Sequence, residues 1–150
     1  MVQRILAASL FSLVLSFPIL AETPAVKVYK SPTCGCCDAW IEHLESNGFQ
    51  VDAENRSDMQ AVKAINGIPT KLSSCHTGFV AGYFIEGHVP AAEIQRLLRE
   101  KPAIAGLSVP DMPMGSPGME GPHPEPYDVL AVDHDGKTTI WSSHRPEPAQ

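Results

Sequence analysis

Hydrophobic and polar positions alternate in short blocks over the first two thirds of the chain, and the blocks predict alternating strands and helices. Val26 to Tyr29 is typical of a short strand. From Cys37 to Asn47, hydrophobic residues recur at helical spacing. A second strand is expected from Phe49 to Ala53, followed by a helix that has Ser57 as its N-cap and ends at Gly67.

The following stretch predicts two more strands and a third helix. The strands, expected at Gly78 to Gly82 and Tyr83 to Val89, meet at a glycine. Pro90 suits the first turn of a helix, and Pro102 marks the end of that helix. The order β-α-β-α-β-β-α is that of a thioredoxin or glutaredoxin core, in which helices cover both faces of a mixed sheet. We therefore predict an α/β, thioredoxin-like fold with its core at residues 25–101.

Residues 102–126 differ from this core in composition. Seven of them are proline, and three are methionines within eight positions: Met112, Met114 and Met119. After this Pro/Met-rich loop, Tyr127 to Val132 and Thr138 to Trp141 are predicted to form a terminal β-hairpin. We expect residues 102–145 to wrap the core, so that residues 25–145 form a single domain.

The first 21 residues have the pattern of a secretory signal peptide. A short basic start with Arg4 precedes an apolar run from Ile5 to Leu20, and the small residue Ala21 precedes a polar stretch. A permanent membrane anchor needs about 20 uninterrupted apolar residues. This run is shorter, and it contains Pro18. We therefore expect cleavage near Ala21 and export to the periplasm without a stable membrane anchor.

Composition and charge exclude one class of partner. The chain of 150 residues is 43% hydrophobic, which is typical of a folded domain. It has 11 Lys and Arg residues against 17 Asp and Glu residues, a formal net charge of −6. Cleavage after residue 21 removes only one charged residue, Arg4, and leaves −7. An acidic chain without a basic patch does not bind phosphate backbones, so we expect no nucleic-acid partner.

The cysteines are the residues most informative about chemistry. Cys34, Cys36 and Cys37 lie within four positions, between the first strand and the first helix. Cys34 and Cys37 form a C-x-x-C motif at a helix N-terminus, where free N–H groups and the helix dipole favour the thiolate. Thiolates take part in disulfide exchange or bind soft metals. Because Cys36 can scramble a disulfide of the motif, the cluster favours a metal site.

Further ligand candidates come from other parts of the chain. In a thioredoxin-like fold, the loop before the third strand abuts the C-x-x-C turn, so Cys75 is expected to lie beside it. His76 follows directly and is the best candidate among the histidines. The other five are each expected to be solvated rather than ligating: His43, His88, His123, His134 and His144. The three methionines offer thioethers, and we expect their loop to form a mobile flap over the cysteines.

Ligand softness points to a metal but leaves alternatives open. Thiolates with thioethers favour Cu(I), whereas thiolates with imidazole favour zinc, which is the alternative metal. In a second interpretation the protein is a thiol–disulfide oxidoreductase, in which Cys34 attacks and Cys37 resolves. In a third, the cysteines form only structural disulfides, as they do in many exported proteins. The residues leave open whether the protein is an enzyme.

Five segments, read together, resemble one family. They are Lys30 to Cys37, Ser74-Cys75-His76-Thr77, Glu86 to Ala91, Gly106 to Pro110 and Met112 to Gly121. From about Val26 to about Trp141, the chain resembles the CopG-type exported copper-resistance proteins.

The resemblance implies a thioredoxin-like fold and copper held at the turn that contains Cys34, Cys36 and Cys37. The ligands it implies are Cys34, Cys36, Cys37 and Cys75, with the methionines as an extension. It also implies redox interconversion of the bound copper in the periplasm. Other periplasmic copper carriers or exporters are the exchange partners that we expect.

Overall fold

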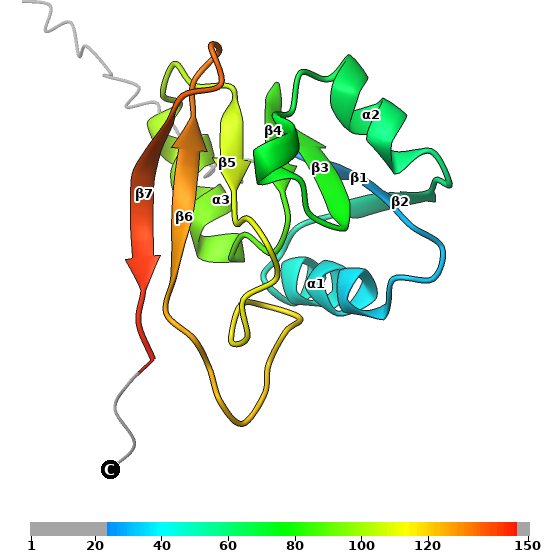
Figure 1. The fold of residues 1–150 in the computed structure, drawn as a ribbon, viewed down its shortest axis with the longest axis vertical. Helices are drawn as coiled ribbons and strands as arrows, with labels where there is room; N and C mark the ends of the chain where they lie inside the picture. Colours follow the sequence, from blue (N-terminus) through cyan, green and yellow to red (C-terminus); the bar gives the residue numbers. More distant parts are fainter. Residues whose placement is uncertain (1–23, 147–150) are drawn as a thin grey trace, which may run out of the picture.

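Seven strands form one mixed sheet in the computed structural model, which describes residues 24–146 (Figure 1). The strands are β1 (Val26–Lys30), β2 (Val51–Asn55), β3 (His76–Val80), β4 (Tyr83–Glu86), β5 (Gly106–Ser108), β6 (Tyr127–Val132) and β7 (Thr138–His144). The helices are α1 (Gly35–Ser46), α2 (Met59–Ile65) and α3 (Ala91–Glu100), and Thr70–Leu72 form a 3-10 turn, η1. This confirms the predicted α/β class, with its mixed sheet, flanking helices and terminal hairpin. The thioredoxin-like assignment stays a prediction.

The strand order places the site-bearing strands in the middle of the sheet. The order is β2-β1-β3-β4-β5-β6-β7. β1 pairs in parallel with β2 and antiparallel with β3, and β3 pairs antiparallel with β4. β4 and β5 are parallel, and β5, β6 and β7 follow as antiparallel neighbours. Residues that precede β3 therefore lie beside residues that follow β1.

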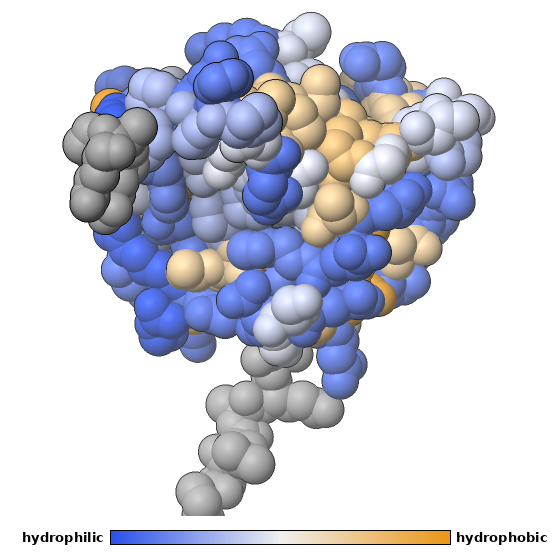
Figure 2. Space-filling model, turned by 90° about the horizontal axis from the view of Figure 1, so that it is seen from below, coloured by the Kyte–Doolittle hydropathy of each residue, from blue (hydrophilic) through white to orange (hydrophobic). Residues whose placement is uncertain are grey.

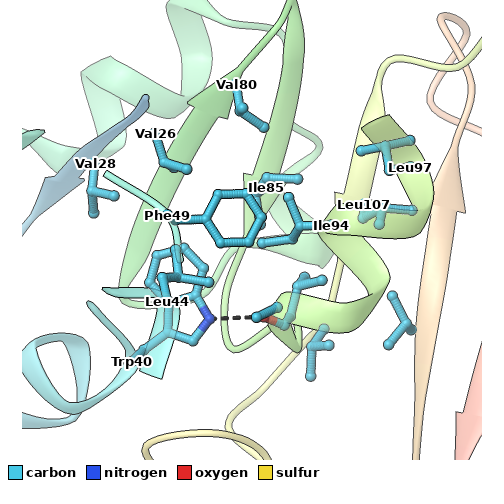
Figure 3. Close-up of a cluster of buried hydrophobic side chains, with 14 of the residues drawn as sticks. Val26, Val28, Trp40, Leu44, Phe49, Val80, Ile85, Ile94, Leu97 and Leu107 are labelled. Atoms are coloured by element: carbon cyan, nitrogen blue, oxygen red, sulfur yellow. Dashed lines mark hydrogen bonds between the residues drawn. The ribbon is translucent and has the colours of Figure 1, made fainter. Parts of the chain in front are cut away.

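The hydrophobic core lies between the sheet and helices α1 and α3 (Figure 3). Trp40 and Leu44 point inward from α1, and Ile94 and Leu97 point inward from α3; all four are fully buried. Their spacing along each helix is the one that places side chains on a single face. The Trp40 Nε1–H group donates a hydrogen bond to the carbonyl oxygen of Val89 at 2.9 Å, which fixes α1 against the segment after β4.

Several element boundaries differ from those predicted. Helix α1 begins at Gly35 rather than Cys37, and the N-cap of α2 is Asp58 rather than Ser57. The sequence does not predict β5, because this strand begins with glycine, which is depleted in strands, and because three residues show no periodicity. It is nevertheless buried and pairs with β4, so the sheet continues into the segment expected to wrap the core.

The hairpin β6–β7 extends the sheet and is attached to α3. The Trp141 Nε1–H group donates a hydrogen bond to Glu93 at 2.9 Å, and the Arg96 guanidinium lies 4.0 Å from the centroid of the Trp141 ring. Residues 109–126, which we call the Met loop, leave β5, pass beside α1 and return to β6 (Figure 1).

The surface seen from below is mainly hydrophilic, with a light-orange area of moderately hydrophobic residues (Figure 2).

Within residues 24–146, none of the helices has the length and apolar character needed to cross a membrane. The predicted signal peptide at residues 1–21 lies outside the described residues.

Candidate metal site

The fold brings all four cysteines together at one end of β1 and β3. Cys34 is the N-cap of α1, and Cys36 and Cys37 lie in its first turn; we call residues 34–37 the cysteine turn. Cys75 immediately precedes β3, where Lys30 of β1 pairs with the first residue of β3. The four sulfur atoms all lie within 4.8 Å of one another. The expected proximity of Cys75 to the cysteine turn is therefore found, and the four residues can hold a metal ion.

The cysteine turn is in its oxidised form. Cys34 and Cys37 form a disulfide, and Cys36 and Cys75 are free thiols that are half-buried. The Cys36 sulfur lies 3.4 Å from that of Cys34 and 3.8 Å from that of Cys75. A disulfide sulfur is not a thiolate, so the disulfide must be reduced before Cys34 and Cys37 can act as thiolate ligands. A structural disulfide alone does not explain the two free thiols packed beside it.

The free Cys75 thiol favours its protonated form. Burial and, to a smaller extent, charge repulsion from the nearby Cys36 together raise the pKa of Cys75 to about 11. The Ser74 hydroxyl lies 3.9 Å from the Cys75 sulfur and lowers the pKa of Cys75 by a smaller amount. In the metal-free protein Cys75 is therefore a thiol at neutral pH, and a metal that binds there displaces its proton.

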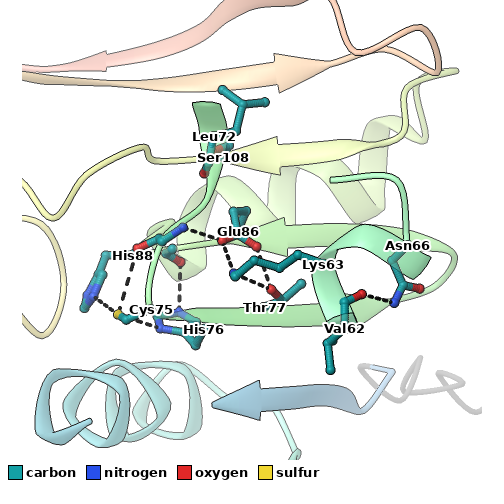
Figure 4. A network of polar contacts seen from close by, with 12 residues as sticks. Val62, Lys63, Asn66, Leu72, Cys75, His76, Thr77, Glu86, His88 and Ser108 are labelled. Carbon is teal, nitrogen blue, oxygen red and sulfur yellow. Dashed lines mark hydrogen bonds and ion pairs between the residues drawn. The ribbon is translucent and has the colours of Figure 1, made fainter. Parts of the chain in front are cut away.

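Two buried imidazole rings face Cys75, one on each side (Figure 4). His76 Nδ1 and His88 Nε2 each lie 3.6 Å from the Cys75 sulfur. The opposite nitrogens donate to backbone carbonyls: His76 Nε2 to Gly87 at 3.0 Å and His88 Nδ1 to Pro117 at 2.7 Å. Because a carbonyl can only accept, these bonds fix the tautomers and leave a lone pair directed at Cys75. This is the arrangement that orients histidine as a metal ligand.

Burial keeps both rings neutral. It lowers the pKa of His76 to about 3, with smaller contributions from His88 and from two lysines. Burial also lowers the pKa of His88. Trp40 packs on the His76 ring, with 4.2 Å between the ring centroids. Cys75, His76 and His88 thus form a second donor set whose ligand atoms lie within 4.8 Å, and the two sets share Cys75.

The expectation that His88 is solvated is wrong. His88 has no exposed surface, because the Met loop covers it and contributes the Pro117 carbonyl. In the sequence, the one feature that points to His88 is its place in the Glu86 to Ala91 segment, which resembles the family. Burial by a distant loop produces no hydrophobic periodicity along the sequence, so the burial of His88 could not be predicted. His43 is also half-buried and accepts a hydrogen bond from the Ala91 N–H group at 3.0 Å.

Three other histidines lie elsewhere on the molecule. His144 is half-buried because it stacks on Tyr127, with 4.8 Å between the ring centroids, and its side chain stays 32% exposed, so it is partly solvated. His123 and His134 are exposed, as expected.

The Met loop covers the cysteine turn through Gly118. The φ angle of Gly118 is +82°. A Cβ atom at this position would lie 2.8 Å from the backbone nitrogen of Trp40 and 2.9 Å from the carbonyl oxygen of Cys36. Only glycine allows so close an approach in this conformation. Met119 follows directly and is half-buried. The loop has its own hydrogen bonds, including one from the Gly115 N–H group to the Met119 carbonyl at 2.8 Å.

The side chains of the other two Met-loop methionines, Met112 and Met114, contact other parts of the molecule. Met112 is 46% exposed and lines a cavity with Tyr127 and Leu130 of β6. The Met114 sulfur packs against Gly121 within the loop. Met119 is the loop methionine that directly follows Gly118, the residue through which the loop contacts the cysteine turn.

Comparison with known proteins identifies the family. A solved structure titled copper resistance protein CopG, form 2, is 45% identical to this chain and matches it with a TM-score of 0.79. The match covers 83% of this chain and 100% of that one. The chain belongs to the CopG copper resistance protein family.

Two further comparisons agree with this assignment. A solved structure titled copper resistance protein CopG, form 1, matches with 44% identity, a TM-score of 0.78 and the same coverage. A family model described as a protein of unknown function, DUF411, matches residues 72–119, which include Cys75, both buried histidines and most of the Met loop. No curated protein matches the chain. The family resemblance seen in the sequence motifs is thereby confirmed.

Proposed function

We propose that this protein binds copper as part of copper resistance or copper handling. In its reduced form, the four thiolates of Cys34, Cys36, Cys37 and Cys75 hold Cu(I). The observation that carries the proposal is the convergence of four sulfur atoms within 4.8 Å in a chain whose solved relatives are titled copper resistance proteins. Sulfur-rich donor sets select Cu(I) over harder divalent ions.

The donor set extends beyond sulfur. His76 and His88 are neutral, are fixed in orientation and present a free lone pair beside Cys75, which supports a role as additional ligands. Among the methionines, Met119 is the strongest candidate because of its place beside Gly118. Zinc is the alternative metal, since thiolate with imidazole also suits Zn(II).

The redox state of the cysteine turn controls this binding. Reduction of the Cys34–Cys37 disulfide by a dithiol takes up two electrons and two protons and oxidises that dithiol to a disulfide. It yields two thiols, which lose their protons when copper binds. Copper affinity should therefore depend on redox conditions and fall in acid.

A second candidate function is thiol–disulfide exchange. The Cys34–Cys37 disulfide supports it, because this pair is the one that an oxidoreductase of this kind uses. Insulin reduction by the metal-free protein, abolished by Cys34→Ser, would favour this function over copper binding.

The protein acts in the periplasm under this proposal. The apolar run after Arg4 supports export, and periplasmic copper carriers or exporters would supply or receive the metal.

Elemental analysis tests the proposed metal. The reduced protein is mixed with equal amounts of Cu(I) and Zn(II), separated from free metal and analysed. We expect copper to be retained, and Cys34→Ser with Cys37→Ser to abolish its retention. Retention of zinc instead, or of no metal, would reject copper binding.

A further inference from the structure

A buried ion pair, Lys63–Glu86, lies next to the segment that contains Cys75 and His76 (Figure 4). Lys63 of α2 is 2% exposed and Glu86 of β4 is fully buried, and their charged groups are in contact. The Thr77 hydroxyl accepts from Lys63 Nζ at 2.9 Å and donates to Glu86 at 2.6 Å. The desolvation of two buried charges often outweighs their mutual attraction. A pair of this kind is therefore weak evidence for stabilisation and suggests another role.

One bond of Glu86 reaches the cysteine segment. The Ser74 backbone N–H group donates to the Glu86 carboxylate at 2.5 Å. Ser74 is covalently linked to Cys75, so this bond fixes the backbone immediately before the thiol. Hydrogen bonds to a charged acceptor are stronger than those between neutral groups.

The next two residues after Glu86 contact the same segment. Gly87 has a φ angle of +73°, and a Cβ atom there would lie 2.9 Å from Ser74 Cβ. The Gly87 carbonyl accepts the bond from His76, and His88 faces the Cys75 sulfur. The end of β4 thus holds the Cys75 segment through three successive residues.

We propose that Lys63, Glu86 and Thr77 form a positioning network that holds Cys75 in place against the cysteine turn. The inference rests on the proposed function, in which Cys75 is a copper ligand. Glu86 acts through the Ser74 N–H group, and Thr77 orients the carboxylate. Lys63 balances the charge of that carboxylate, which would otherwise oppose the formation of thiolates nearby.

Two double variants separate the hydrogen bond from the charges. Lys63→Met with Glu86→Gln removes both charges but keeps a side-chain oxygen that can accept from the Ser74 N–H group. Lys63→Met with Glu86→Leu removes that acceptor as well, and hydrophobic replacement of a buried ion pair is often tolerated. Thr77→Val, which keeps the side-chain shape, serves as a third variant if the Leu variant does not fold.

The first readout needs no metal. In a Cys36→Ser background with the Cys34–Cys37 disulfide closed, Cys75 is the single free thiol. We expect its alkylation by iodoacetamide to be about tenfold faster in the Leu variant, because the segment opens more often, and nearly unchanged in the Gln variant. Thr77→Val should give a smaller increase. Equal rates in the parent, the Leu variant and Thr77→Val would overturn the proposal.

The second readout is copper affinity, measured in reduced protein with all four cysteines present. We expect the Leu variant to fall to the affinity of Cys75→Ser and the Gln variant to keep that of the parent. Faster alkylation with unchanged copper affinity would overturn the positioning role. If the parent protein itself binds no Cu(I), the proposed function fails, and the alkylation rates alone decide whether the network holds Cys75.

Discussion

At the scale of single residues, the backbone determines what the two buried histidines can do. His76 and His88 each donate one ring N–H group to a carbonyl oxygen, and each presents the other nitrogen to Cys75. A ring held in this way loses little further conformational freedom when it binds a metal. The carbonyls of Gly87 and Pro117 are therefore as much part of the site as the rings.

The first prediction concerns His88. We expect His88→Ala to lower Cu(I) affinity at least about tenfold, because a preoriented donor beside Cys75 is lost. The matched control is His134→Ala, since His134 is exposed and lies in the hairpin turn. Competition with a chromogenic Cu(I) chelator measures both affinities. Equal affinities in the two variants would show that His88 is not a ligand.

The second prediction concerns Gly118 in the Met loop. We expect Gly118→Ala to destabilise the protein by about 1–3 kcal/mol more than Gly82→Ala. Both glycines have φ angles near +85°, but a Cβ atom at Gly118 would contact α1 at 2.8 Å, whereas one at Gly82 has nothing within 4 Å. Urea unfolding measures the difference. Equal losses would mean that the loop does not pack on α1 in solution.

At the scale of elements, helices α1 and α3 meet through a histidine. The N–H group of Ala91 at the start of α3 donates to His43 Nε2 of α1 at 3.0 Å. Burial lowers the pKa of His43, so the folded state favours the neutral ring that can accept this bond. Protonation would remove the acceptor.

The third prediction is a pH dependence that this contact causes. Because the pKa of His43 is lower in the folded state, the unfolded state binds the proton first as pH falls. The stabilisation is complete above about pH 6.5 and is lost progressively as the pH falls below it. We expect His43→Gln, which keeps an acceptor, to reduce the slope of unfolding free energy between pH 7 and 5. An unchanged slope would reject the contact as its cause.

Local patterns predicted most of these elements, and contacts between distant elements explain the rest. The apolar spacing of Trp40 and Leu44 was sufficient to predict α1, and the loop position of Cys75 was sufficient to place it near the cysteine turn. β5 and the burial of His88 depend on partners far away in sequence, namely β4 and the Met loop. The Lys63–Glu86 pair gives no sequence signal for the same reason.

At the scale of the whole molecule, the site exists only when the sheet is formed. Its donors come from the turn after β1, the segment before β3 and the end of β4, and the Met loop covers them. A metal that binds such a site stabilises the folded chain by its binding free energy. The Cys34–Cys37 disulfide takes up two of the four cysteine sulfurs, so the proposed function requires redox state and metal binding to be coupled.

The most direct test is a Cu(I) competition titration of the reduced and the disulfide form, side by side. We expect tight binding by the reduced protein and a large loss of affinity in the disulfide form, because two thiolates are missing. Cys34→Ser with Cys37→Ser should match the disulfide form under reducing conditions. Equal Cu(I) affinity in the reduced protein and in this double variant would contradict the claim that the cysteine turn holds copper.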